Sequence, residues 1–270
     1  MGSGIAESVA VAGIPVVVRD VDEVSIKRAA SRLETSLARA VKGGKLDAAQ
    51  AAAARERVEM RTDLEAIGAA DLVIEAVPEQ ARLKLEVMHE IDATVREDTV
   101  IASNTSSIPI AELAQAVHAP HRVIGLHFFS PVPVMSLVEV VVALDTSEET
   151  RNRAKLFAER IGKTPIETKD RSGFIVNMLL VPYLMAAVRM FEDGFATRED
   201  IDTGMKLGCG HPMGPLALCD LIGLDVLYAV CDSLYEEFKR DEYAPPPLLK
   251  RMVASGRLGR KSGRGFYEYD

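Results

Sequence analysis

The sequence is short of cysteine and of positive charge. Its 270 residues include three cysteines, Cys209, Cys219 and Cys231, which cannot all pair with one another and lack the spacing of metal ligands. We therefore expect a reduced, cytoplasmic protein without a disulfide framework or a metal site. Lys and Arg number 32 against 40 Asp and Glu, giving a net charge of −8. Nucleic-acid binding needs a basic face, so no nucleic-acid partner is expected.

Long apolar runs are also missing. The most apolar segment, Phe174 to Val188, has about 15 residues and contains Asn177 and Pro182, whereas a membrane span needs about 18. No charged segment followed by an apolar stretch opens the chain, so secretion is not expected. We interpret this segment as a helix buried between layers or subunits, and such a large apolar face favours a homodimer.

Strand and helix patterns alternate over the first 145 residues. Helices are predicted over Ser3–Ala12, over 22–58 with a break at Gly43–Gly44, and over about 80–95. The runs that predict buried strands are Ile14–Val18, Leu72–Ile74, Thr99–Ala102, Val123–Leu126 and Leu137–Val142. This alternation is typical of a doubly wound, parallel sheet of the Rossmann type.

The strand signal largely disappears after Lys169. Glycine and proline punctuation there predicts the helices 174–192, 198–207, 215–239 and 246–254. The predicted fold class is therefore α/β, with a Rossmann-type sheet domain over residues 1–169. An all-helical domain over residues 170–270 follows it.

A dinucleotide-binding loop requires Gly-x-Gly-x-x-Gly before its first helix, because the glycines let backbone amides approach the pyrophosphate. The opening residues do not satisfy this spacing, since position 7 is Glu, but Gly2 can be the third glycine. Asp20 ends the next strand 18 residues later, where a carboxylate would bind the ribose hydroxyl and favour NAD. A turn residue is the alternative for Asp20, and Arg19 leaves room for NADP. The glycine cluster 208–214 has the wrong spacing and is interpreted as a turn.

Polar residues follow two of the predicted strands. Ser103–Ser107 comes after one strand, His127 lies at the end of another, and Glu139 lies 12 residues further on. Oxidation of an alcohol requires a base for the hydroxyl proton, and histidine suits this role near neutral pH. A carboxylate on the far ring nitrogen would fix its tautomer. A structural core histidine is the alternative.

At these residues the chain closely resembles the L-3-hydroxyacyl-CoA dehydrogenase family, in particular short bacterial 3-hydroxybutyryl-CoA dehydrogenases. The resemblance runs from Gly2 to Tyr269. Its most specific segments are SNTSS at 103–107, GLHFFSPVPVMSLVEVV at 125–141, DRSGFIVNMLLVPYL at 170–184, HPMGPL at 211–216 and GRKSGRGFYEY at 259–269.

The resemblance implies a role for each matching residue. His127 would be the general base, Glu139 its orienting partner, and Ser106 the hydroxyl that binds the substrate's 3-oxygen. Asn177 would complete the site, although a polar residue satisfied at a helix start explains it as well. The implied cofactor contacts are Gly2, Asp20, Glu79, Lys84, Ser106, Ser130 and Lys261. The implied substrate contacts are Ser36, Lys42, Ser106 and Asn177.

The chain departs from the family pattern at two places. Ser130 stands where the family usually has Asn, so that contact with the nicotinamide would be lost or mediated by water. The family's first strand and its first two loop glycines have no counterpart. Because that strand lies at the centre of the sheet, its loss would cost about 10 kcal/mol or more. We therefore hypothesise that Met1 is an internal methionine, or that the chain is a fragment.

Together these features predict a cytoplasmic, NAD-dependent enzyme of fatty-acid β-oxidation that interconverts a 3-hydroxyacyl-CoA, such as 3-hydroxybutyryl-CoA, and the 3-ketoacyl-CoA. The substrate would lie between the two domains. One alternative is a hydroxy-acid dehydrogenase on the same scaffold that does not use coenzyme A. The other is a truncated paralogue that keeps a helical dimer but binds NAD poorly.

Overall fold

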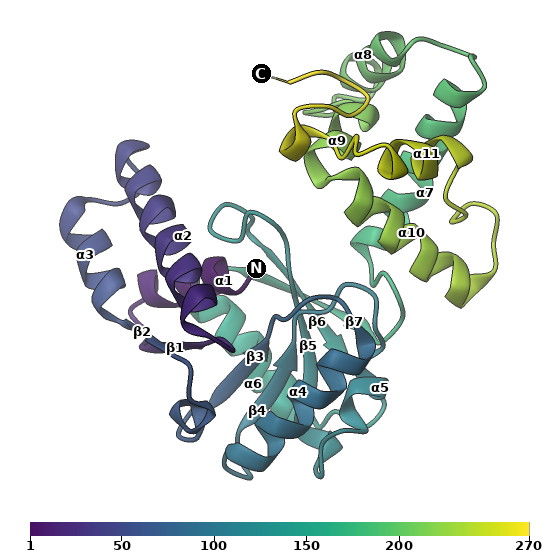
Figure 1. Ribbon diagram of the computed structural model, residues 1–270. Coiled ribbons are helices and arrows are strands. Elements are labelled where there is room, and N and C mark those ends of the chain that lie inside the picture. Colours follow the sequence, from purple (N-terminus) through teal and green to yellow (C-terminus); the bar gives the residue numbers. More distant parts are fainter. Residues whose placement is uncertain (270) are drawn as a thin grey trace. The chain divides into compact units, whose positions relative to one another are not determined.

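The computed structural model describes residues 1–269, which form two compact units with a boundary between Asp170 and Arg171. The first unit contains strands and helices (Figure 1), and the second contains helices and isolated β-bridges. Within residues 1–269, no helix is long and apolar enough to cross a membrane. The same residues contain no cluster of His, Cys, Asp and Glu that could hold a metal ion.

The strands of the first unit form two sheets. Their bounds are Val16–Arg19 (β1), Val58–Arg61 (β2), Leu72–Glu75 (β3), Val100–Ser103 (β4), Val123–Phe128 (β5), Leu137–Val142 (β6) and Thr164–Lys169 (β7). β1 pairs with β2, and a five-stranded sheet has the order β3-β4-β5-β6-β7. β5 is buried along its whole length, which explains its continuous apolar run. This arrangement of strands confirms the predicted Rossmann-type domain.

Two strands and one pairing differ from the prediction. β2 was not predicted because it has only four residues and begins at the end of the helical region predicted over 22–58. β7 was not predicted because it contains Pro165, which a strand tolerates at the edge of a sheet, where β7 lies. The sheet is also not wholly parallel, since β5 and β6 are antiparallel. The connection between them, residues 129–136, is too short for the crossover that parallel strands need.

Helices cover both faces of the larger sheet. The helices of the first unit are Gly2–Val11 (α1), Glu23–Lys42 (α2), Ala48–Glu56 (α3), Ala81–Thr94 (α4), Ile110–Ala114 (α5) and Glu148–Arg160 (α6), with 3-10 turns at Leu64–Ile67 and Pro120–Arg122. Of these, α2 and α3 pack against β2 of the smaller sheet. In Figure 1, α4 and α5 lie in front of the sheet and α6 lies behind it. The predicted break at Gly43–Gly44 is confirmed, and Asp47 begins α3 with a capping box.

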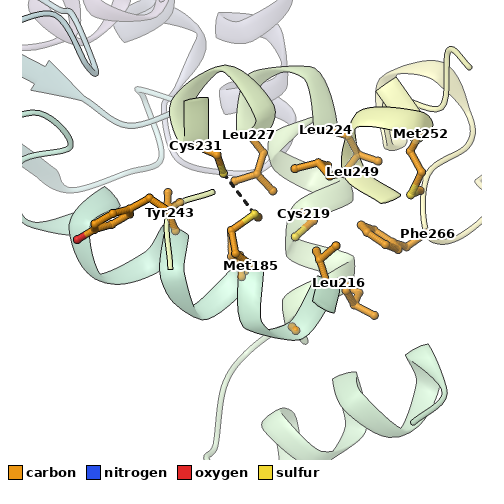
Figure 2. Packing of buried hydrophobic residues seen from close by; sticks show 14 of the residues in the cluster. Met185, Leu216, Cys219, Leu224, Leu227, Cys231, Tyr243, Leu249, Met252 and Phe266 are labelled. Carbon is orange, nitrogen blue, oxygen red and sulfur yellow. Dashed lines mark hydrogen bonds between the residues drawn. The ribbon is translucent and has the colours of Figure 1, made fainter. Parts of the chain in front are cut away.

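The second unit packs its helices around one apolar core. The helices are Val176–Glu192 (α7), Arg198–Gly208 (α8), Pro215–Ile222 (α9), Leu224–Phe238 (α10) and Pro247–Ala254 (α11), with a 3-10 turn at Arg260–Ser262. Figure 2 shows Met185, Cys219 and Cys231 among the buried side chains. The single helix predicted over 215–239 is wrong, because Gly223 separates α9 from α10 with a φ of +100° that favours glycine.

Within the second unit, two buried aspartates bind residues near the end of the chain by hydrogen bonds. Asp220 accepts hydrogen bonds from the backbone N–H groups of Phe266 and Tyr267, both at 2.9 Å. Asp202 accepts one from the Tyr267 hydroxyl at 3.0 Å. A Cβ atom on Gly265 would lie 1.9 Å from Asp220 Oδ1, so only glycine allows this approach. The segment 259–269 therefore has a structural role in the second unit.

Glu7 gives the first unit a pH-dependent stability. It lies on α1 with 3% exposure, and burial raises the pKa of its carboxyl, against a hydrogen bond from Ser36 and the charges of Arg39 and Lys163. A carboxyl whose pKa is raised by folding favours the fold below its unfolded pKa, and this contribution is lost as pH rises through the folded pKa. Glu7→Gln should therefore raise the melting temperature at pH 8 but not at pH 4. Melting curves of this variant at both pH values, with Glu56→Gln at an exposed position of the same unit as the control, check this.

Candidate active site

His127 and Glu139 face each other across the antiparallel strands β5 and β6. They are direct register partners, and His127 Nδ1 lies 2.7 Å from Glu139 Oε2. His127 is 4% exposed and Glu139 is fully buried. Because a buried carboxylate can only accept, we assign the proton to Nδ1. The other ring nitrogen, Nε2, is then left as an acceptor.

Ser106 lies on the acceptor side of the imidazole. Its Oγ is 3.0 Å from His127 Nε2, so with the assigned tautomer the hydroxyl donates to the ring. Ser106 belongs to the serine-rich loop, residues 103–107, which begins at the last residue of β4. Asn104 of this loop accepts a hydrogen bond at 2.9 Å from the Phe128 N–H of β5. Strand ends that are neighbours in the sheet thus bring the hydroxyl and the imidazole together.

The Glu79 carboxylate accepts hydrogen bonds from the serine-rich loop. Its Oε1 accepts hydrogen bonds from the Thr105 hydroxyl at 2.6 Å, from the Ser106 N–H at 2.8 Å and from the Ser107 N–H at 3.0 Å. Burial by itself raises the pKa of Glu79, but the hydrogen bond from Thr105 and the charge of Lys84 more than offset this, so that the pKa lies below its ordinary value. The carboxylate is therefore ionised near neutral pH.

Lys84 is buried between two carboxylates. Its side chain is 1% exposed, and Nζ lies 2.8 Å from Glu75 Oε1 and 3.3 Å from Glu79 Oε2. Glu75 was not among the predicted site residues. The signal that could have found it is a carboxylate ending the apolar run of β3, in register with Ser103 at the end of β4.

The remaining predicted residues are spread over both units. Gly2 begins α1, and Asp20 follows β1 with Oδ1 accepting a hydrogen bond from the Val21 N–H at 2.8 Å, as a turn residue does. Ser36 and Lys42 lie on α2, and Ser130 is exposed after β5. In the second unit, Asn177 lies in the first turn of α7, and Lys261 forms an ion pair with Asp225 at 2.5 Å. The glycine cluster 208–214 joins α8 to α9, which confirms the turn.

The donor set at the ends of β1, β3 and β4 fits NAD. A dinucleotide needs backbone amides for its phosphates and an acceptor for its ribose hydroxyls. The amino end of α1 supplies amides at Gly2, and the half-exposed carboxylate of Asp20 follows β1. A second carboxylate, Glu79, stands between β3 and the serine-rich loop. The residues of this chain therefore match the polar groups of the coenzyme.

Comparisons with known proteins show the family to which this chain is similar. Residues 1–171 match the family model of the 3-hydroxyacyl-CoA dehydrogenase NAD-binding domain, and residues 173–269 match that of the C-terminal domain. The chain is 51% identical over 271 residues to 3-hydroxybutyryl-CoA dehydrogenase of Mycobacterium tuberculosis, covering 100% of this chain and 95% of that protein. It is also 42% identical over 278 residues to human mitochondrial hydroxyacyl-coenzyme A dehydrogenase, covering 100% and 88%.

A solved structure extends the likeness to three dimensions. The (S)-3-hydroxybutyryl-CoA dehydrogenase of Ralstonia eutropha has a TM-score of 0.94 at 45% identity, covering 100% of this chain and 95% of that chain. Both domain models match in order along one chain and together span nearly all of its residues. The chain therefore belongs to the 3-hydroxyacyl-CoA dehydrogenase family, with an NAD-binding domain followed by the family's C-terminal domain.

Proposed function

We propose that this protein interconverts an L-3-hydroxyacyl-CoA, with 3-hydroxybutyryl-CoA as the favoured substrate, and the corresponding 3-ketoacyl-CoA. The observation that carries the proposal is the hydrogen-bonded chain Ser106–His127–Glu139, with contacts of 3.0 and 2.7 Å. The relatives named for 3-hydroxybutyryl-CoA, at 51% and 45% identity, support the choice of a short acyl chain.

In the proposed mechanism, His127 Nε2 takes the proton of the 3-hydroxyl group. The Ser106 hydroxyl binds the 3-oxygen and keeps it next to the imidazole. Glu139 stabilises the imidazolium that forms, because its buried carboxylate already accepts a hydrogen bond from the Nδ1–H group. NAD, when bound, supplies the acceptor for the hydride. In the reverse direction, the imidazolium returns its proton to the 3-oxygen.

The coenzyme contacts in this proposal are Gly2, Asp20, Glu79, Ser106, Ser130 and Lys261. Lys84 contributes indirectly, because its ammonium is already engaged by Glu75, Glu79 and the Val77 carbonyl. A carboxylate at position 20 favours NAD, because it would repel the 2′-phosphate of NADP. We propose that Ser36 and Lys42 contact coenzyme A and that Asn177 contacts the acyl group.

A substrate comparison tests the function. With NADH, the protein should reduce acetoacetyl-CoA and show little turnover of free acetoacetate at the same concentration. Equal rates with both would favour a hydroxy-acid dehydrogenase that does not use coenzyme A. Binding of NADH without turnover of either would contradict the proposed activity, and failure to bind NADH would favour the paralogue that keeps only the helical dimer.

We propose that the second unit binds substrate and forms a homodimer in the cytoplasm. Large apolar side chains are exposed on its helices and loops, among them Leu179, Phe195 and Leu207 at 72, 79 and 82%. An exposed apolar surface of this kind is typical of an interface. The double variant Leu179→Glu/Leu207→Glu should change a dimer into a monomer in light scattering after gel filtration. Leu156→Glu, at a position of α6 in the first unit that is 64% exposed, should leave the dimer intact.

A further inference from the structure

A buried carboxylate stands at the carboxyl end of β3. Glu75 is 3% exposed, and its side chain accepts hydrogen bonds from the Val77 N–H at 2.6 Å and from the Ser103 hydroxyl at 2.5 Å. Lys84 Nζ donates to both of its oxygens, at 2.8 and 3.0 Å. A charge is kept this far from water only where partners of opposite charge compensate its desolvation. The Glu75 carboxylate is therefore compensated by Lys84 and by these hydrogen bonds.

Lys84 joins Glu75 to Glu79. Its ammonium contacts both carboxylates and donates to the Val77 carbonyl at 3.2 Å. The single positive charge of Lys84 thus pairs with the negative charges of both Glu75 and Glu79. Both carboxylates in turn bind the serine-rich loop, Glu75 at Ser103 and Glu79 at the three residues that follow Asn104. One ionic cluster, buried at Glu75 and Lys84 and partly exposed at Glu79, therefore supports the loop.

The cluster is continuous with the chemical site. The Ser103 hydroxyl that donates to Glu75 also accepts the Thr105 N–H at 3.2 Å, and the Asn104 N–H donates to the Glu75 carbonyl at 2.9 Å. Ser106 comes next in the chain and contacts His127. We propose that Glu75, together with Lys84, is a positioning residue that fixes the serine-rich loop and thereby places the Ser106 hydroxyl against the imidazole. This inference rests on the proposed function of Ser106 and His127.

Glu75→Gln tests the inference with little change of shape. Glutamine fills the same volume and leaves Lys84 paired with Glu79, but it lacks the negative charge that binds Lys84 and Ser103. Ser103→Ala is a second variant, which removes only the hydroxyl between Glu75 and the loop. Asp92→Asn is the matched control. Asp92 is also a buried carboxylate, 7% exposed and paired with Arg122, and Arg122 contacts Thr99 at the amino end of β4, opposite the serine-rich loop.

The expected result is a loss of turnover rather than of substrate affinity. A small displacement of a group that orients substrate lowers the rate steeply, so kcat for acetoacetyl-CoA should fall about 10- to 100-fold in Glu75→Gln. The KM should change much less. Ser103→Ala should shift kcat in the same direction by a smaller factor, and Asp92→Asn should keep kcat even if its melting temperature falls. In the background of Ser106→Ala, Glu75→Gln should have almost no further effect on kcat, since both changes act on one hydroxyl.

Hydrogen exchange supplies a readout that does not depend on turnover. The Ser106 and Ser107 amides, which donate to Glu79, should exchange at least about tenfold faster in Glu75→Gln than in the unchanged protein or in Asp92→Asn. Unchanged exchange at these amides would overturn the inference, and so would an effect on kcat that simply adds to that of Ser106→Ala. If the unchanged protein does not reduce acetoacetyl-CoA, the proposed function fails, while the exchange measurement still decides the positioning of the loop.

Discussion

Replacing His127 by alanine is expected to lower kcat by about 10²- to 10⁴-fold, the usual contribution of a positioned general base. The imidazole is the group that contacts both Ser106 and Glu139, so its removal takes away the proposed acceptor of the substrate proton. NADH affinity should remain close to that of the unchanged protein. Steady-state rates with acetoacetyl-CoA, together with a fluorescence titration of NADH, measure the two quantities separately.

His121→Ala is the matched control for this variant. His121 lies in the 3-10 turn before β5, at the opposite end of the strand from His127, and its replacement should leave kcat unchanged. A normal kcat in His127→Ala would exclude the imidazole from the reaction. A parallel loss in both variants would show damage to β5 instead of to the chemistry.

Glu139→Gln is expected to lower kcat by about 10³- to 10⁴-fold, as the loss of a buried orienting carboxylate does in other enzymes that rely on a histidine base. Glutamine is neutral, so it cannot stabilise the imidazolium. Its amide group can also donate to Nδ1, which would leave the proton on Nε2, where the substrate proton has to go. The measurement is kcat for both directions of the reaction, with folding checked by circular dichroism.

The exposed Glu112→Gln, on α5 of the same unit, controls for the loss of one negative charge and should keep full activity. If Glu139→Gln were as active as the unchanged protein, orientation of His127 through Nδ1 would not contribute to turnover. The buried position of Glu139 also makes some loss of stability expected, but a folded variant with normal KM and low kcat would separate the two effects.

The pairing of His127 with Glu139 could be predicted only in part. Each residue is a polar group inside an apolar run, and this contrast marked both as candidates. Their direct register depends on β5 and β6 being antiparallel, whereas the alternation of strands and helices favoured parallel neighbours. The short connection 129–136 was the signal for the antiparallel pairing, because a parallel crossover needs a dozen residues or more.

Glu75 could have been found as the carboxylate that ends the apolar run of β3, but its contact with Lys84 and the contact of Lys84 with Glu79 could not be predicted from the sequence. Lys84 was expected to contact the coenzyme, and on a charged helix it has no local mark that distinguishes it from a solvated lysine. Its burial follows from the packing of α4 against β3 and β4, which brings Glu75, Glu79 and Ser103 around one ammonium. Contacts of this kind depend on tertiary structure, which periodicity does not encode.

The base and its orienting carboxylate belong to two consecutive strands joined by residues 129–136. Closing so short a connection costs little chain entropy, and pairs of low sequence separation are favoured early in folding. Assembly of this dyad therefore does not wait for distant segments to meet, whereas addition of the Ser106 hydroxyl requires β4 to dock beside β5. Cutting the backbone between residues 129 and 136 would separate β5 from β6, and the two strands would then have to meet by diffusion. A cut elsewhere in the chain would leave the short connection between these strands intact.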